Sequence, residues 1–275
     1  MNDSNNFMTP SISAPVLAPV SPSMPPLPAP LAHALAAGGT GSGLGKRERT
    51  RRQLLEAAIR VISARGAAGA TIGEIAAVAG MTTGTVYNHF RTKEEVVQAL
   101  ALWLGETLCR AITASQAGIR EGAERMAIGI RRYIWLAEQS PPWAVLMMEV
   151  AIAAPALVAE ISAYALADLR MGIKQKSFRV PSEAAAMNLI NGTVLQAMQS
   201  VALGAAGAGH GSAVAAVMLR GLGLDFDAAT EVARRPLPDL PGPAVARPAT
   251  AAPAKLAPPK APPAKVAPPK APRRG

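Results

Sequence analysis

The sequence predicts an all-α protein, in which a small basic helical module is followed by a larger helical body between disordered ends. Helical spacings of apolar residues run through residues 46–235, and no stretch there alternates as a half-buried strand would. Of the 25 prolines, 8 lie in residues 1–45 and 13 in residues 236–275. Ends this rich in proline do not build a core. We therefore expect a disordered Pro/Ala/Ser-rich leader (1–45), a module (46–93), a body (94–235) and a disordered Lys/Pro/Ala-rich tail (236–275).

Positive charge is concentrated in the module and the tail. The whole chain of 275 residues carries a formal net charge of +10. The module holds nine Lys and Arg against three Glu, and the tail holds seven against one Asp. The body is nearly neutral, with twelve against thirteen. A compact basic module favours a polyanion as partner, although a merely solvated basic surface is the alternative until a motif decides between them.

Several features of the sequence indicate the cell compartment in which the protein resides. Cys109 is the only cysteine, which excludes an intramolecular disulfide and a thiolate zinc site. The first residues lack the basic leader of a secretory signal. Residues 184–219 carry no formal charge, which raises the question of a membrane span. Polar residues such as Asn188 and Gln196 favour a buried interface helix instead, so we expect a cytoplasmic protein without a membrane partner.

The apolar periodicity and the cap residues predict the helices in order. Leu55, Ile59 and Ile62 share one side of the first helix, which Gly66 and Gly69 end. The expected helices cover about residues 46–65, 72–79, 83–90, 93–115, 126–139, 143–152, 155–174, 182–201 and 212–221, with one or two further turns in 225–235.

Residues 71–90, TIGEIAAVAGMTTGTVYNHF, form the most informative segment. Thr71 and Glu74 make a capping box for the first of two short helices. Gly80 permits the tight or left-handed backbone of the turn between them. Two helices joined in this way indicate a helix-turn-helix.

The second helix of this motif is expected to expose a polar surface. Threonine side chains can meet base edges, while a tyrosine hydroxyl and helix N-terminal amides can meet phosphates. Gly84 has no side chain, so the helix could lie close to a duplex. The polar residues that we expect to face outward are Thr82, Thr83, Thr85, Tyr87, Asn88 and His89.

With this spacing the module resembles the DNA-binding signature of the TetR family of transcriptional repressors, over about residues 48–108. Met81 stands where the family often has valine and Asn88 where it often has an aromatic residue, which leaves the sequence preference open. The residues that carry the resemblance are Thr71, Ile75, Ala76, Ala79, Gly80, Thr82, Gly84, Thr85, Tyr87, His89, Phe90, Lys93 and Glu94.

The resemblance implies a role for each matching residue. Tyr87 and Lys93 would grip phosphates, as would Thr71 at its helix start. Thr82, Thr83 and His89 would contact the operator, with Thr83 nearest to the base edges. Tyr87 could instead pack on its neighbours, and His89 could serve as a hydrogen-bonding residue at the helix end. Arg51 and Arg52 could either touch phosphate or remain solvated.

The body is rich in Met and Trp on apolar helix faces, and a bundle of this kind can house a pocket for an apolar or aromatic small molecule. For each of these residues taken alone, core packing is the favoured role. The resemblance implies such a pocket and a dimer built from the last two long helices. Our pocket candidates are Trp103, Met126, Trp135, Trp143, Met147, Met171 and Met187, and our dimer-interface candidates are Ile190, Val194, Met198 and Val201.

These observations predict a homodimeric repressor that a small effector releases from a palindromic double-stranded operator. We expect no cofactor and no metal, because the three histidines (His33, His89 and His210) have no metal-ligand spacing and no phosphate-binding loop is present. An enzyme is therefore disfavoured. The alternative is a protein that coats DNA without sequence preference through its cationic tail.

Overall fold

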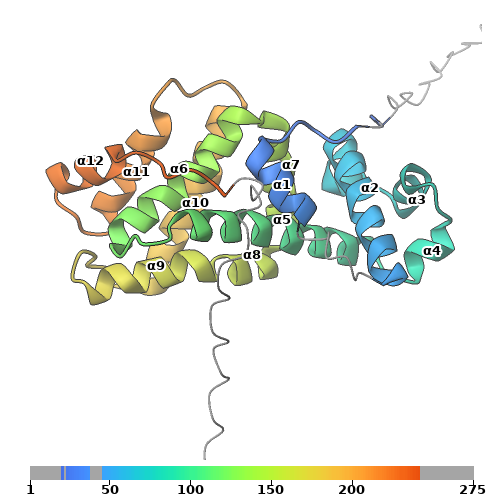
Figure 1. Cartoon of the computed structure of the whole chain (residues 1–275), viewed down its shortest axis with the longest axis horizontal. Coiled ribbons are helices and arrows are strands. Elements are labelled where there is room, and N and C mark those ends of the chain that lie inside the picture. The colour runs from blue at the N-terminus through green and yellow to red at the C-terminus, as the bar shows by residue number, and fades with distance from the viewer. Residues whose placement is uncertain (1–19, 22, 38–44, 242–275) are drawn as a thin grey trace, which may run out of the picture. The chain divides into compact units, whose positions relative to one another are not determined.

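A computed structural model describes residues 20–21, 23–37 and 45–241 (Figure 1). The predictions for the other leader residues and for the tail beyond residue 241 lie outside these ranges. Within them all regular structure is helical, as expected, and forms twelve helices. The helices are α1 (Ala29–Ala37), α2 (Lys46–Gly69), α3 (Ile72–Ala79), α4 (Thr83–Tyr87), α5 (Lys93–Ser115), α6 (Gly122–Gln139), α7 (Pro141–Ala153), α8 (Pro155–Ile161), α9 (Ala163–Lys174), α10 (Glu183–Ala202), α11 (His210–Gly221) and α12 (Phe226–Arg234).

Helices α2, α3 and α4 form a three-helix head. Its core is fully apolar, and Ile59, Ile75 and Val86 are completely buried in it. Thr71, Thr82 and Thr92 each accept a hydrogen bond from the backbone N–H three residues on, so they cap α3, α4 and α5. Gly80 ends α3 in the left-handed conformation, with φ of 67°. The motif therefore folds as its caps and its turn glycine predict.

The body is arranged around α6, which packs against α9, α10 and α11, while α7 lies between the head helix α2 and the body helices α5 and α10. Helix α5 is long and apolar enough to cross a membrane by length and composition alone, but 56% of its apolar window is buried inside the protein. It therefore has the burial of a core helix. The uncharged stretch at 184–219, where the sequence raised the membrane question, is divided between α10 and α11.

The predicted single helix over 155–174 is wrong, because the chain turns at Ser162 between α8 and α9. The Ile161 side chain fills the space beside Gly105, where a Cβ atom would come within 2.2 Å of it. The Ser162 hydroxyl donates to Asn191 Oδ1 at 3.2 Å. These contacts with α5 and α10 fix adjacent residues, and the local sequence pattern contains neither of them.

The leader is not disordered throughout, and this corrects our prediction for residues 23–37. Leu31 and Leu35 of α1 are 3% and 8% exposed and belong to the same core as the head and α5. The Trp143 indole N–H donates to the Pro25 carbonyl at 2.8 Å. The guanidinium of Arg52 in α2 donates to the carbonyls of Leu35 and Ala36, both at 3.0 Å. We call residues 24–37 the strap, because they contact both the head and the body.

The ordered body also extends past its predicted end at residue 235. Leu240 is only 7% exposed, and the Arg132 guanidinium donates to the Pro238 carbonyl. Arg235 pairs with Glu121 and with Glu124, which raises the pKa of its guanidinium above the ordinary value. Two leucines in the proline-rich run provide the apolar contacts there, at residues 237 and 240.

Replacing both strap leucines, Leu31→Ala with Leu35→Ala, should lower the free energy of unfolding by about 2 kcal/mol or more. Each truncation removes buried methyl groups and leaves a cavity, and the total loss is limited by the free energy with which the strap docks. Urea denaturation followed by circular dichroism measures the change. The exposed His33→Ala in the same helix is the matched control, and equal stability of the two variants would show that the strap does not dock.

Candidate DNA-binding surface and ligand cavity

Helix α4 and the turn after it carry most of the predicted DNA-contacting residues, and they are accessible. Thr82, Thr83, Gly84 and Asn88 are exposed, and Tyr87 is 56% exposed. The alternative that Tyr87 packs on its neighbours therefore does not hold in this structure. A Cβ atom added at Gly84 would have no neighbour nearer than the Thr82 hydroxyl, at 3.8 Å. This face of the helix is thus unobstructed.

Thr82, which caps α4, and Thr85 of α4 form hydrogen bonds with each other. The Thr82 and Thr85 hydroxyls lie 3.0 Å apart and share a hydrogen bond, and Thr82 Oγ1 also accepts from the Thr85 N–H. Thr71 is similarly tied to Glu74 at the start of α3. Thr83 has no such bond among the described residues, so its hydroxyl is available to a partner.

His89 and Lys93 are less free than the sequence suggested. Burial, together with the nearby positive charges of Arg47 and Arg51, lowers the pKa of His89 and so favours its neutral imidazole. Its Nδ1 atom is buried without a hydrogen-bond partner in the described ranges. The Lys93 ammonium group donates to the Ala68 carbonyl at 2.9 Å, which leaves two of its three donors for other partners.

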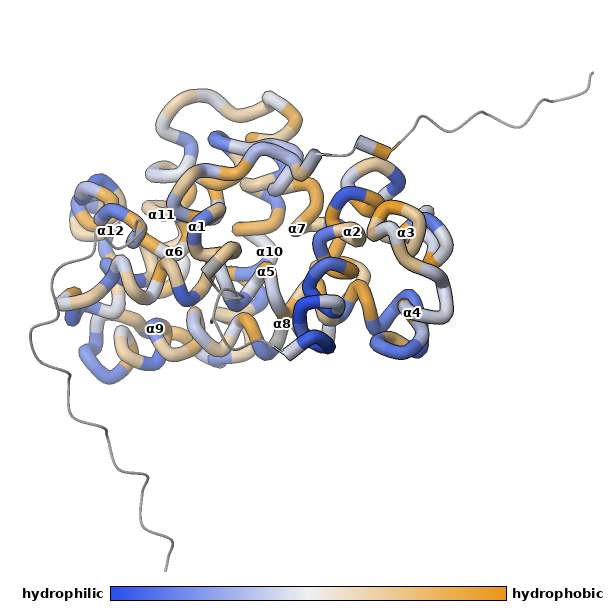
Figure 2. Tube along the Cα trace, turned by 45° about the vertical axis from the view of Figure 1, so that its right-hand side comes forward, coloured by the Kyte–Doolittle hydropathy of each residue, from blue (hydrophilic) through white to orange (hydrophobic). Residues whose placement is uncertain are grey.

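The start of α2 adds basic residues beside α4 (Figure 1). Lys46 and Arg47 are exposed in its first turn. The Arg51 guanidinium lies over the Phe90 ring, 5.0 Å from its centroid, and so ties α2 to the end of α4. Figure 2 shows hydrophilic residues at the start of α2 and on α4. Arg52 does not join this surface, because it lies over Trp103 and binds the strap.

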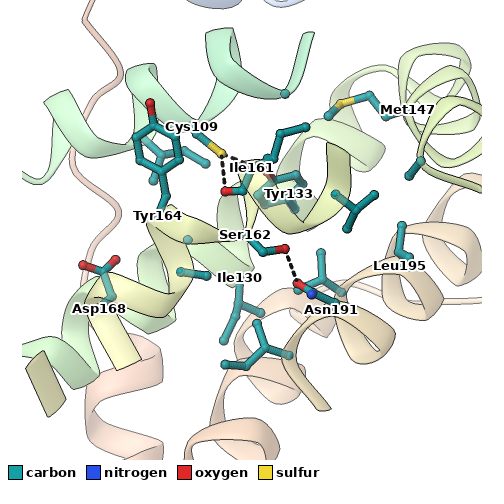
Figure 3. A pocket seen from close by; sticks show the side chains of 18 of the residues that line it. Cys109, Ile130, Tyr133, Met147, Ile161, Ser162, Tyr164, Asp168, Asn191 and Leu195 are labelled. Carbon is teal, nitrogen blue, oxygen red and sulfur yellow. Dashed lines mark hydrogen bonds between the residues drawn. The ribbon is translucent and has the colours of Figure 1, made fainter. Parts of the chain in front are cut away.

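A cavity of about 150 Å³, partly open to solvent, lies between α5, α6, α7, α8, α9 and α10 (Figure 3). Met126 and Met147 line it as predicted. Most other lining residues are aliphatic, and the bulkiest of them are Leu104, Ile112, Ile130, Val150, Ile161, Ile190, Val194, Leu195 and Met198.

Five of our pocket candidates do not line this cavity: Trp103, Trp135, Trp143, Met171 and Met187. The indoles of Trp103 and Trp135 lie under the guanidinium groups of Arg52 and Arg132. Trp143 is 2% exposed and binds the strap. An apolar helix face has more than one possible neighbour, and composition alone does not identify which neighbour it meets.

The predicted dimer residues also face inward. Ile190, Val194 and Met198 line the cavity, and Val201 packs against the body core. Since Ile190 and Met198 are 3% and 1% exposed within a single chain, they cannot form a surface. The sequence pattern identified the apolar face of α10 correctly. It did not show that this face packs within the same chain rather than against a second copy.

Neutral polar groups lie at the centre of the cavity. The Tyr133 hydroxyl and the Cys109 sulfur are 3.3 Å apart, and burial raises the pKa of both side chains. Nearby, Ser162 donates to Asn191, as Figure 3 shows. Arg125 and Asp168 are the charged residues of the lining, and they form an ion pair of 2.6 Å with each other. Every polar group here is therefore uncharged or neutralised.

Helix α7 connects this cavity to the head. Met147, Val150 and Ala151 line the cavity on one side of the helix. On another side, the Glu149 carboxylate accepts a hydrogen bond from the Ala67 N–H at 3.1 Å. Ala67 follows Gly66, whose φ of 71° interrupts α2. A displacement of α7 would thus act directly on the end of the first head helix.

In the described part of the chain no group of three or more His, Cys, Asp or Glu residues could hold a metal ion. The geometry is that of a helix-turn-helix head joined to a helical body with an internal cavity. Two family models match it: residues 54–100 match "Bacterial regulatory proteins, tetR family", and residues 121–235 match "Tetracyclin repressor-like, C-terminal domain". The chain belongs to the tetR family of transcriptional regulators, which confirms the resemblance. This is a family of regulators rather than of enzymes.

Curated relatives are similar over a short segment of the chain. The regulator TtgR of Pseudomonas putida is 48% identical over 60 residues, which are 22% of this chain and 29% of that protein. The regulator AcrR of Shigella flexneri is 39% identical over 49 residues, which are 18% and 23% of the two chains. The matched segment spans less than a third of these relatives.

Solved structures are similar over head and body together. RolR in complex with resorcinol superposes with a TM-score of 0.59 and 27% identity, over 71% of this chain and 98% of that one. FadR of Bacillus subtilis in complex with stearoyl-CoA has a TM-score of 0.52 and 18% identity, over 62% and 96%. The second likeness is one of fold alone.

Proposed function

We propose that this chain is a sequence-specific repressor that leaves its palindromic operator when a small apolar or aromatic effector binds the body. The observation that carries the proposal is the unobstructed threonine and tyrosine face of α4 beside a basic helix start. Thr83 is the candidate for base contacts, and Thr71, Tyr87 and Lys93 are the candidates for phosphate contacts. Such a protein would be associated with the nucleoid.

The proposed effector site is the cavity of the body. Its volume and its aliphatic lining suit a small apolar or aromatic compound. RolR, which is 27% identical to this chain, was crystallised with resorcinol, a single aromatic ring with two hydroxyls. This supports an aromatic effector here.

We also propose a homodimer, with an interface on the outer face of α10 and α11. Leu189, Leu203 and Val217 are 40%, 72% and 68% exposed, and exposed apolar side chains that form a patch mark interaction sites on proteins. No formal charge interrupts α10 after Glu183. A Cβ atom at the exposed Gly192 would meet nothing within 4 Å, so another helix could approach closely there. Two heads in such a dimer would reach half-sites about 34–36 Å apart, or a small multiple of that distance.

The proposed release mechanism runs through α7. A compound that binds more tightly to one position of α7 than to another favours that position, and the contact between Glu149 and Ala67 passes the movement on to the head. The size of the effect is limited by the difference between the compound's affinities for the two positions.

Selection of the full chain on random duplexes at physiological ionic strength should enrich one inverted repeat. Thr83→Ala should reduce discrimination between that repeat and a scrambled duplex by about tenfold, because it removes a base contact. Lys93→Ala should instead weaken binding to both duplexes alike. Equal binding to all sequences, without enrichment of any, would support the DNA-coating alternative. An unchanged sequence preference in Thr83→Ala would exclude the assigned base contact.

Gly192→Glu should raise the dimer dissociation constant at least about tenfold, because it places a charge in an apolar interface. The monomer should keep its fold, since the site is open and glycine is a poor helix former. Sedimentation equilibrium measures the change. Ala167→Glu, on the exposed side of α9, is the matched control, and an unchanged dimer in Gly192→Glu would contradict the proposed interface.

Val194→Phe, which fills part of the cavity, should mimic an effector and lower operator affinity at least about fivefold, within the usual range of allosteric coupling. In a Glu149→Ala background the same substitution should have a much smaller effect, because the bond to Ala67 is absent. Fluorescence anisotropy with the selected operator measures both ratios, and Val145→Phe on the exposed side of α7 is the control. An equal effect in both backgrounds would exclude Glu149 as the connection.

A further inference from the structure

The size of the cavity limits its occupant to about one ring. The volume is about 150 Å³, and an apolar cavity of about this size in another protein binds a single benzene molecule. A long acyl chain attached to a nucleotide occupies several times this volume. Although the fold is shared with a stearoyl-CoA-binding protein, the cavity volume does not suit such a ligand.

The charges around the cavity limit the occupant to a neutral molecule. Arg125 and Asp168 are the charged residues of the lining, and their charges neutralise each other through the 2.6 Å ion pair between Nε and Oδ1. The Cys109 thiol and the Tyr133 phenol are held in their neutral forms by burial. An ionised carboxylate placed in this cavity would lose hydration and would find no cation that is not already paired with an anion, which is costly.

Asn191 and Ser162 determine where an oxygen atom of the ligand would bind in the cavity. Asn191 Oδ1 accepts from Ser162, so the orientation of the amide is set. Its NH₂ group has no hydrogen-bond partner among the described residues, and Asn191 lines the cavity. The Ser162 hydroxyl has lone pairs left to accept a hydrogen bond from a ligand. A hydroxyl on the ligand could therefore accept from Asn191 and donate to Ser162.

We infer that the cavity binds an uncharged single-ring aromatic compound bearing a hydroxyl group, held at that oxygen by Asn191 and Ser162. This inference rests on the proposed function and names the chemical class of its effector. The aliphatic lining holds the ring, while the Asn191–Ser162 pair distinguishes a phenol from a hydrocarbon of the same shape.

Calorimetric titration of the full chain with four probes tests the inference. Resorcinol should bind at least about tenfold more tightly than 1,3-dimethylbenzene, which has the same shape without hydroxyls. It should also bind at least about tenfold more tightly than 2,4-dihydroxybenzoate, which adds a carboxylate. Stearoyl-CoA should not bind. No binding by resorcinol, or tighter binding of the benzoate or of stearoyl-CoA, would overturn the inference.

Asn191→Leu should abolish the preference for resorcinol over 1,3-dimethylbenzene while the hydrocarbon still binds. Retained hydrocarbon binding also shows that this variant is folded, and Ser162→Ala is the milder second variant. Asn188→Leu, on the exposed side of α10, should keep the preference. An unchanged preference in Asn191→Leu would overturn the assigned anchor. Operator selection is measured separately, so a failure here with a selected operator would leave the proposed repressor intact.

Discussion

The hydrogen bond from the Ala67 N–H to the Glu149 carboxylate ties the end of the first head helix to α7 of the body. Gly66 interrupts α2 with a positive φ and so leaves a backbone donor near the end of that helix. A helix end without a partner would carry a cost in free energy, and Glu149 satisfies the donor from α7. Because the same α7 lines the cavity, the element that satisfies the head backbone is also the one that an occupant would contact.

The head was predictable because its structure is determined locally. The threonine cap at 71 and the glycine turn at 80 involve residues within a few positions of each other, and both fold as the pattern predicts. The body was less predictable, since its helices are recognisable but their neighbours are not. The α10 face with Ile190 and Met198 was taken for a surface, although it closes the chain's own cavity.

The strap shows why composition misleads at the chain ends. Proline-rich segments rarely fold alone, but residues 24–37 bury two leucines against surfaces supplied by α5 and α7. Its prolines at 25 and 26 lack an N–H but keep carbonyls, which accept hydrogen bonds from Trp143 and Ser140. Ordering such a segment needs a preformed partner surface, and a local reading of the sequence contains no information about one.

Two side chains link the strap to the cavity. Leu104 and Met147 line the cavity of the body on one side, and on the other they line a small space of about 20 Å³ beside Leu27, Leu31 and Leu35. Protein interiors are packed tightly enough that a side chain displaced from one face presses on the other. Methionine is the most adaptable residue for such a position because it is unbranched and flexible. An occupant that moves Met147 would therefore change the surface against which the strap packs. The strap in turn accepts hydrogen bonds from Arg52 of the head.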